Sequence, residues 1–155
     1  ENMGIFADLT VKENMLLAAR SAKNAQQMDS KRLEWIFQLF PAVEKFWNHP
    51  AGKLSGGQKQ MLAVARAIVE PRKLLIVDEP SKGLAPAIIN NMIDAFAQLK
   101  QTGTTILLVE QNISFAKRLG DQVAVMDNGK VVHAGSMQEL ADNEDLQHAL
   151  LGLAI

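Results

Sequence analysis

The sequence contains no cysteine, which excludes disulfide bonds and thiolate metal sites. It also lacks any apolar run long enough for a transmembrane helix, and its first residues have neither the basic region nor the hydrophobic core of a signal peptide. Acidic and basic residues nearly balance at a net charge of −1, so nothing indicates a nucleic-acid-binding surface. Of the 155 residues 48% are hydrophobic, which is typical of a globular chain with one domain or two small subdomains.

A further absence is a glycine-rich phosphate-binding loop of the form Gly-x-x-x-x-Gly-Lys-Ser/Thr. The pairs Gly52-Lys53 and Gly129-Lys130 lack the preceding glycine, and neither lysine is followed by serine or threonine. The chain begins with Glu1 and not with methionine. We therefore expect the chain to be a piece of a longer protein, with any such loop upstream of Glu1.

Residues 1–53 are predicted to be mainly helical. Residues 10–13, Thr-Val-Lys-Glu, have the spacing of a capping box and predict a helix over about 11–22. Apolar residues recur with helical spacing over 33–40 and predict a second amphipathic helix, which Pro41 would stop.

The next part of the chain alternates between helical and strand patterns. Residues 55–58 have capping-box spacing and precede a helical apolar stripe. The apolar run 74–77 predicts a short strand covered on both faces, Pro86 opens another helix, and 104–109 form a second apolar run. This order predicts a parallel βαβ unit with a right-handed crossover.

The last part of the chain predicts a β-hairpin followed by helices. The strands 123–126 and 130–133 flank Asp127-Asn128-Gly129, a strong hairpin signal. Ser136 caps a short helix, and leucines at 146–151 mark one more. The sequence therefore predicts an α/β fold with parallel strands, an α-helical subdomain and a C-terminal β-hairpin with helices.

The segment Leu54-Ser55-Gly56-Gly57-Gln58 predicts an anion-binding helix end. The two glycines let backbone N–H groups approach a ligand closely, and the helix dipole favours negative charge there. Ser55 adds a hydroxyl donor and Gln58 an amide. The alternative is an ordinary capped helix with a flexible glycine hinge.

Asp78 and Glu79 follow the first strand at its carboxyl end, the edge at which open α/β sheets bind ligands. Successive strand residues point to opposite faces, so the two carboxylates would have different roles. Asp78 would hold Mg²⁺ directly or through water, and Glu79 would orient and polarise a water that attacks a γ-phosphate. The alternative is a strand that ends in two solvated acids and is closed by Pro80.

The order and spacing of these motifs resemble the C-terminal half of an ATP-binding cassette (ABC) ATPase, and the resemblance runs over essentially the whole chain. The segments 79–86 and 108–112 are similar to the ATPase subunits of branched-chain amino-acid transporters and their urea and amide relatives. The resemblance implies a Q-loop exit and helical subdomain at 1–53. It implies a partial P-loop NTPase core at 54–155, with the signature helix, Walker B, D-loop and switch region.

The resemblance also implies roles for single residues. Ser55-Gly56-Gly57-Gln58 would contact ATP held by the second ATP-binding subunit of a head-to-tail dimer. Asp78 would be the Mg²⁺-binding Walker B aspartate and Glu79 the catalytic base. Residues 81–85 match the D-loop, and Gln111 falls at the catalytic switch position, where most cassettes have histidine. Gln111 cannot take up a proton, although its amide can hydrogen-bond a γ-phosphate oxygen.

Two further residues depart from the family pattern. Ala85 replaces the usual D-loop aspartate, which removes one polar contact across the dimer interface. Glu1, at the position expected for the Q-loop, supplies a carboxylate where glutamine is commoner.

The function implied by the resemblance is that of a fragment of the ATP-hydrolysing subunit of an ABC importer for branched-chain amino acids or related small solutes, with no nucleic acid as a partner. Its partners would be a second ATP-binding subunit and transmembrane permease subunits, and it would lie peripherally at the cytoplasmic face of the inner membrane. We expect the intact subunit to hydrolyse ATP with Mg²⁺, and this chain alone to be inactive because it lacks a phosphate loop.

Two alternatives stay open. One is a fragment of a non-transport ABC ATPase of DNA repair or translation, although only a short helix fits between Gln58 and Leu74, where the repair class has a long coiled-coil insertion. The other is a non-enzymatic, truncated module that folds or associates with a second copy and never turns over ATP.

Overall fold

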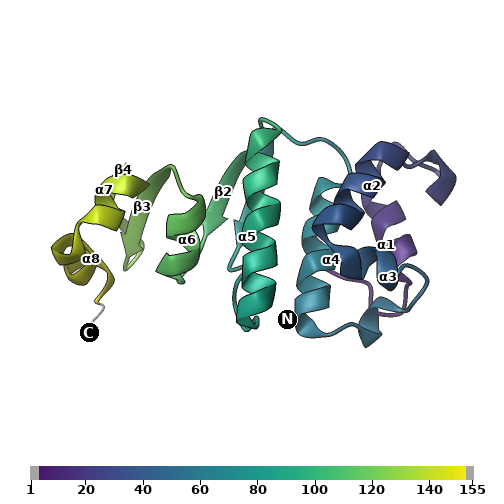
Figure 1. Ribbon diagram of the computed structural model, residues 1–155, viewed down its shortest axis with the longest axis horizontal. Helices are drawn as coiled ribbons and strands as arrows, with labels where there is room; N and C mark the ends of the chain where they lie inside the picture. Colours follow the sequence, from purple (N-terminus) through teal and green to yellow (C-terminus); the bar gives the residue numbers. More distant parts are fainter. Residues whose placement is uncertain (1–3, 153–155) are drawn as a thin grey trace. The chain divides into compact units, whose positions relative to one another are not determined.

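The computed structural model describes residues 4–152, and the chain divides into two compact units, Glu1–Glu110 and Gln111–Ile155 (Figure 1). The first unit contains a group of helices and a βαβ unit, and the second contains a β-hairpin with short helices. The boundary at residue 53, between the helical subdomain and the ATPase core that the family resemblance implies, stays a prediction. Within residues 4–152, no helix has the length and apolar character needed to cross a membrane.

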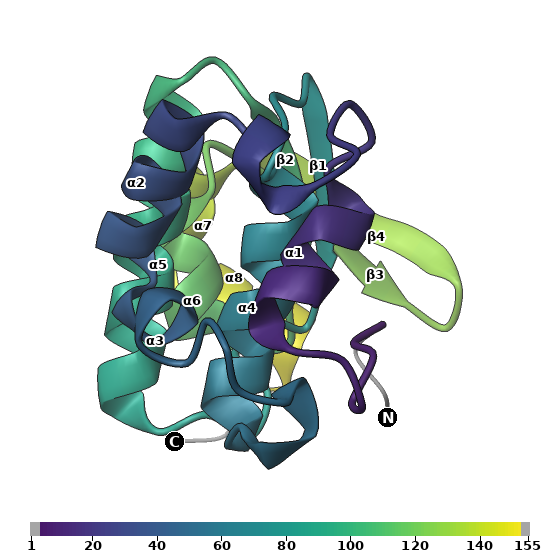
Figure 2. The same cartoon turned by 90° about the vertical axis from the view of Figure 1, so that its right-hand side faces the viewer.

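The helical part of the first unit is built around α4. Its elements are α1 (Val11–Ala18), η1 (Ala25–Gln27), α2 (Ser30–Leu39), α3 (Pro41–Lys45), η2 (Ala51–Lys53) and α4 (Gly56–Ile68). Both α1 and α3 pack against α4 (Figure 2). The first helix ends at Ala18, earlier than predicted, and Pro41 opens α3, which the sequence analysis missed. Proline suits this first helical position because the N–H that it lacks would have no partner there.

The predicted capping box at the start of α1 is confirmed. The Glu13 backbone N–H donates to Thr10 Oγ1 at 3.2 Å, and the Thr10 backbone N–H donates to Glu13 Oε2 at 2.7 Å. The Thr10 hydroxyl also donates to Glu13 Oε2 at 2.7 Å, and this bond, followed by the one from the Thr10 backbone N–H, lowers the pKa of the Glu13 carboxyl. The box therefore sets the first residue of the helix.

Asn14, on α1, is fully buried and ties the N-terminal segment to this helix. Its Oδ1 accepts from the Phe6 backbone N–H at 3.0 Å. Its Nδ2 donates to the Phe6 carbonyl at 2.9 Å and to the Thr10 carbonyl at 3.0 Å. A buried amide is stable only when its donors and acceptors are paired, so Asn14 fixes the path of residues 6–10.

The segment before α4 is held against the segment before α1. The Ala51 N–H donates to the Leu9 carbonyl, and the Gly52 N–H donates to the Ala7 carbonyl, both at 2.8 Å. A Cβ at Gly52 would lie 3.0 Å from the Ala7 carbonyl oxygen, so this close approach requires glycine. These contacts position the chain that enters α4.

The predicted parallel βαβ unit is confirmed. Its elements are β1 (Leu74–Asp78), α5 (Pro86–Gln101) and β2 (Thr105–Val109). The strands pair in parallel, in a register that runs from Leu74 opposite Thr105 to Asp78 opposite Val109. In Figure 1, α5 lies between this strand pair and the helices around α4.

The prediction that the first strand is covered on both faces is wrong for the described residues. Leu75 is buried, with 6% of its surface exposed, whereas Leu74 and Ile76 on the opposite face are 53% and 64% exposed. The paired residue Leu107 of β2 is 54% exposed on the same face. A continuous apolar run is typical of two covered faces, and here only one face has a covering layer.

The second unit is a hairpin with helices, as predicted. Its elements are α6 (Ile113–Leu119), β3 (Gln122–Asp127), β4 (Lys130–Ser136), α7 (Met137–Asp142) and α8 (Glu144–Leu151). Asn128 and Gly129 both have positive φ, at 46° and 76°, which is the backbone of a two-residue type I′ turn. Val125, Met137 and Leu140 form its small core.

We predict that Asn14→Ala destabilises the first unit by about 2–4 kcal/mol, because it leaves the Phe6 and Thr10 backbone groups without their buried partner and opens a cavity. Urea unfolding followed by tryptophan fluorescence measures this effect, since Trp35 and Trp47 both lie in the same unit as Asn14. The control is Asn91→Ala, at an exposed position of α5, which should change stability by less than about 0.5 kcal/mol. Equal effects of the two substitutions would contradict the assigned role of Asn14.

Candidate functional site

The N-terminal end of α4 carries the predicted anion-binding segment. Ser55 is the N-cap: its Oγ accepts from the Gln58 N–H at 3.3 Å, and Gln58 Oε1 accepts from the Ser55 N–H at 2.9 Å. The next backbone bond of the helix runs from the Lys59 N–H to the Ser55 carbonyl at 2.9 Å. The N–H groups of Gly56 and Gly57 therefore precede the hydrogen-bonded part of the helix, at its electropositive end.

The two glycines of this segment lie in different surroundings, so a side chain is disfavoured at Gly57 but not at Gly56. A Cβ at Gly56 would meet no atom within 4 Å, so the space before the helix end is open. A Cβ at Gly57 would lie 3.3 Å from Ile88 Cγ2 and 3.7 Å from Leu84 Cδ2. Gly57 thus allows the end of α4 to approach the start of α5 closely, and Gly56 leaves the backbone accessible to a ligand.

The capping geometry is compatible with binding an anion. The cap uses Ser55 Oγ and Gln58 Oε1 as acceptors, so the hydroxyl hydrogen and the amide NH₂ keep their capacity to donate. α4 has 13 residues, long enough for its dipole to favour negative charge at this end. The capped-helix interpretation and the anion-binding interpretation are therefore compatible, because the cap uses acceptors and an anion would use donors.

Asp78 and Glu79 lie together at the carboxyl end of β1, as predicted, but strand alternation does not separate them. Asp78 is the last strand residue and is exposed, on the same face as Ile76. Glu79 has a φ of 44°, in the left-handed region, and its N–H donates to the Val109 carbonyl at 2.8 Å. The direction of the Glu79 side chain is therefore set by a turn, and the argument from alternating strand faces is wrong for this residue.

The turn after Glu79 is closed by four polar contacts. The Lys82 N–H donates to the Glu79 carbonyl at 3.2 Å, and the Leu84 N–H donates to the Ser81 carbonyl at 3.2 Å. Lys82 Nζ pairs with Glu79 Oε2 at 2.6 Å. Ser81 is buried, and its N–H donates to Glu110 Oε1 at 2.8 Å. This turn carries the first residues of the predicted D-loop.

A magnesium ion at the carboxyl end of β1 would have few protein side chains as ligands. No group of three or more histidine, aspartate or glutamate residues gathers as a metal site within the described part of the chain. Mg²⁺ commonly binds through one or two carboxylates together with water and phosphate oxygens. The exposed Asp78 carboxylate fits that coordination, so the residues present are suited to Mg²⁺ brought with a phosphate ligand.

Gln111, the predicted switch residue, opens the second unit. It is exposed and immediately precedes Asn112, the N-cap of α6, whose Oδ1 accepts from the Phe115 N–H at 3.1 Å. The structure thus brings Asp78, Glu79 and the D-loop turn together in the first unit and describes Gln111 with the second unit.

The sequence analysis missed Glu110 as a candidate. Glu110 directly follows the apolar strand β2, as Glu79 follows β1, and this shared position was the available signal. The ion pair between Glu79 and Lys82 was also missed, although the two residues are only three positions apart.

The segment that precedes α1 is bound to α4 through Arg66. The Arg66 guanidinium donates to the Gly4 carbonyl and lies 5.4 Å from the centre of the Phe6 ring. Burial lowers the pKa of Arg66. Glu1, predicted at the Q-loop position, lies outside the described residues.

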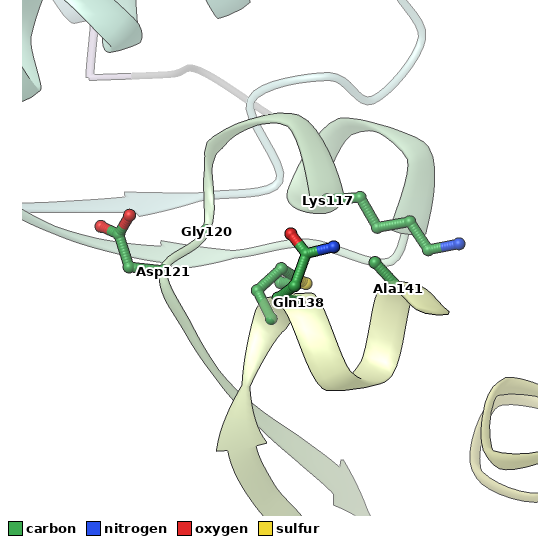
Figure 3. Close-up of a pocket in the computed structure, with 6 residues that line it drawn as sticks. Lys117, Gly120, Asp121, Gln138 and Ala141 are labelled. Atoms are coloured by element: carbon green, nitrogen blue, oxygen red, sulfur yellow. The ribbon is translucent and has the colours of Figure 1, made fainter. Parts of the chain in front are cut away.

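The second unit has a shallow hollow of about 260 Å³ that contains no predicted site residue (Figure 3). Lys117 and Asp121 lie on opposite sides of it in Figure 3. Its lining consists of Lys117, Gly120, Asp121, Met137, Gln138 and Ala141. A Cβ at Gly120 would lie 2.6 Å from Met137 Cε, so this glycine allows α7 to pack closely beside it.

Comparison with curated proteins finds relatives that are named transport ATP-binding proteins. It is 37% identical over 153 residues to the high-affinity branched-chain amino acid transport ATP-binding protein BraG of Pseudomonas aeruginosa, covering 98% of this chain and 64% of that protein. It is 35% identical over 150 residues to LivF of Archaeoglobus fulgidus, a probable branched-chain amino acid transport ATP-binding protein, covering 96% of this chain and 63% of that protein. The chain therefore spans somewhat less than two thirds of the length of these relatives.

Comparison with solved structures gives the same fold. A dimeric post-hydrolysis state of an ATP-binding cassette bound to ADP and Pi matches with a TM-score of 0.74 at 23% identity, covering 88% of this chain and 60% of that one. The fold is thus that of an ABC ATPase cassette. Residues 1–82 match the family model described as ABC transporter, and the chain belongs to the ABC transporter family.

Proposed function

We propose that this chain forms the signature, Walker B and switch part of the ATP-hydrolysing subunit of an importer for branched-chain amino acids or related small solutes. The observation that carries the proposal is the end of β1, where the exposed Asp78 is followed by Glu79 in a left-handed turn. The relatives BraG and LivF, whose names specify branched-chain amino acid transport, support the class of solute.

In this proposal the chain's own residues act on MgATP in three ways. Asp78 holds the ion by its exposed carboxylate, and the ion, when bound, neutralises charge on the phosphates. Glu79 orients a water for attack on the γ-phosphate and accepts its proton. Gln111 donates an amide hydrogen bond to a γ-phosphate oxygen.

The Glu79 carboxylate already has a cationic partner in Lys82, at 2.6 Å. The Lys82 side chain is 68% exposed and on a flexible stem, so it can turn aside at small cost when a nucleotide and water arrive. We infer that Lys82 releases Glu79 before hydrolysis.

The signature end of α4 acts on a different nucleotide in this proposal. The N–H groups of Gly56 and Gly57, with the Ser55 hydroxyl and the Gln58 amide, bind the γ-phosphate of ATP held by a second ATP-binding subunit. The likeness to a dimeric cassette bound to ADP and Pi supports this arrangement. A two-fold dimer makes each subunit contribute to both sites through the same surface.

The remaining partners of the proposed subunit are transmembrane permease subunits, and its place is the cytoplasmic face of the inner membrane, where it lies peripherally. No nucleic acid takes part. The proposed activity belongs to the complete subunit, because the 155 residues contain no Gly-x-x-x-x-Gly-Lys-Ser/Thr loop to hold the phosphates in cis.

We predict that Glu79→Gln lowers the turnover of ATP by the complete subunit by about 10²-fold or more, because an amide cannot accept the proton of the attacking water. ATP-bound dimers should still form, since the substitution keeps the size of the side chain. Steady-state phosphate release measures turnover, and size-exclusion chromatography with MgATP measures dimers.

The control for this substitution is Glu34→Gln, the same chemical change at an exposed position of α2. It should leave turnover unchanged. Normal turnover in Glu79→Gln would remove Glu79 from the role of base.

We also predict that the 155-residue chain alone neither hydrolyses ATP nor binds it tightly, because one helix end and one exposed carboxylate do not surround the phosphates. Isothermal titration calorimetry with MgATP tests this, with the complete subunit measured under the same conditions as the positive control. Micromolar affinity of the short chain for MgATP would contradict the prediction.

A further inference from the structure

We propose that Glu110 is a positioning residue for Glu79. Its carboxylate holds the turn that follows β1 in the conformation that presents the Glu79 side chain. The observation behind the proposal is the hydrogen bond from the buried Ser81 N–H to Glu110 Oε1, at 2.8 Å. The inference rests on the proposed function, since it takes Glu79 to be the base.

The backbone of Glu79 needs such support. Its φ of 44° lies in the left-handed region, which is unfavourable for a residue with a Cβ. A strained residue of this kind persists only where surrounding contacts determine its conformation fully. The conformation of Glu79 must therefore be determined by the hydrogen bonds of the turn.

Each backbone N–H group of the turn from Glu79 to Lys82 has an identified acceptor. The Glu79 N–H donates to the Val109 carbonyl at 2.8 Å, and the Lys82 N–H donates to the Glu79 carbonyl at 3.2 Å. Pro80, between them, is buried and has no N–H to donate. The remaining donor is the Ser81 N–H, which Glu110 accepts.

Two of these acceptors come from consecutive residues at the end of β2. The first anchor is the Val109 carbonyl, which accepts from the Glu79 N–H before Pro80. The second anchor is the Glu110 carboxylate, which accepts from the Ser81 N–H after Pro80. Glu79 donates to the first anchor, Ser81 donates to the second, and the two anchors are the last residue of β2 and the residue that follows it. Loss of the second anchor would leave a buried N–H without its acceptor and free the turn to relax.

The ion pair between Glu79 and Lys82 does not provide equivalent support. The Lys82 side chain is 68% exposed, and exposed ion pairs contribute little to stability because water screens them. By contrast, a hydrogen bond from a buried N–H to a carboxylate is charge-assisted and costly to lose. The turn therefore depends on Glu110 more than on Lys82.

This reasoning requires an oxygen acceptor at position 110 and not a negative charge as such. Gln keeps an acceptor oxygen at the same distance from the backbone as Glu, whereas Ala has none. The pair Glu110→Ala and Glu110→Gln therefore separates the hydrogen bond from the charge. Glu34→Ala, at an exposed position of α2, controls for the loss of one carboxylate.

The first measurement is amide hydrogen exchange in the 155-residue chain, followed by NMR. Exchange of the Ser81 amide should be about tenfold faster in Glu110→Ala than in the unmodified chain, and near the unmodified rate in Glu110→Gln and Glu34→Ala. Unchanged exchange in Glu110→Ala would overturn the proposal. This measurement involves no ATP, so its result is independent of the proposed function.

The second measurement is ATP turnover by the complete subunit. Glu110→Ala should lower kcat about tenfold with KM for ATP changed by less than about twofold, and Glu110→Gln should restore most of kcat. Unchanged kcat in Glu110→Ala, or equal losses in Ala and Gln, would overturn the positioning role. Failure of the proposed function has a different signature, namely no turnover by the unmodified subunit or full turnover in Glu79→Gln.

Discussion

The parallel pairing of β1 with β2 is the interaction on which the candidate site depends. The hydrogen-bond ladder continues one residue past β1, through the bond from the Glu79 N–H to the Val109 carbonyl. That bond determines where the strand ends and where the turn begins. Asp78 consequently stays on the exposed sheet face, while the chain turns at Glu79, where φ is 44°. The crossover helix α5 allows this pairing, because parallel strands require a long connection.

The end of α4 is built on a different physical basis, local to a few residues. A capping box satisfies the backbone with acceptor atoms, and a Cβ at Gly56 would meet no atom within 4 Å. Gly57 serves close packing on Ile88. Helix capping and the proposed ligand recognition therefore use the same short segment without competing for the same hydrogen-bonding capacity.

Features that depend on short-range chemistry could be predicted from the sequence. The capping boxes at Thr10 and Ser55, the type I′ turn at Asn128 and the βαβ order all follow from residues close together in the chain. The exposed face of β1 could not be predicted, because an apolar run does not reveal how many layers cover it. The anchor at Glu110 joins residues 29 positions apart, and no local pattern encodes such a contact.

Under the proposed function, the left-handed backbone of Glu79 is a compromise between stability and activity. Glycine adopts this conformation without strain, and asparagine or aspartate adopt it more readily than glutamate does. A sequence selected for folding alone would therefore favour another residue at position 79. Under the proposed function, the chain tolerates a locally less stable backbone at Glu79 because the long carboxylate side chain is needed at the sheet edge.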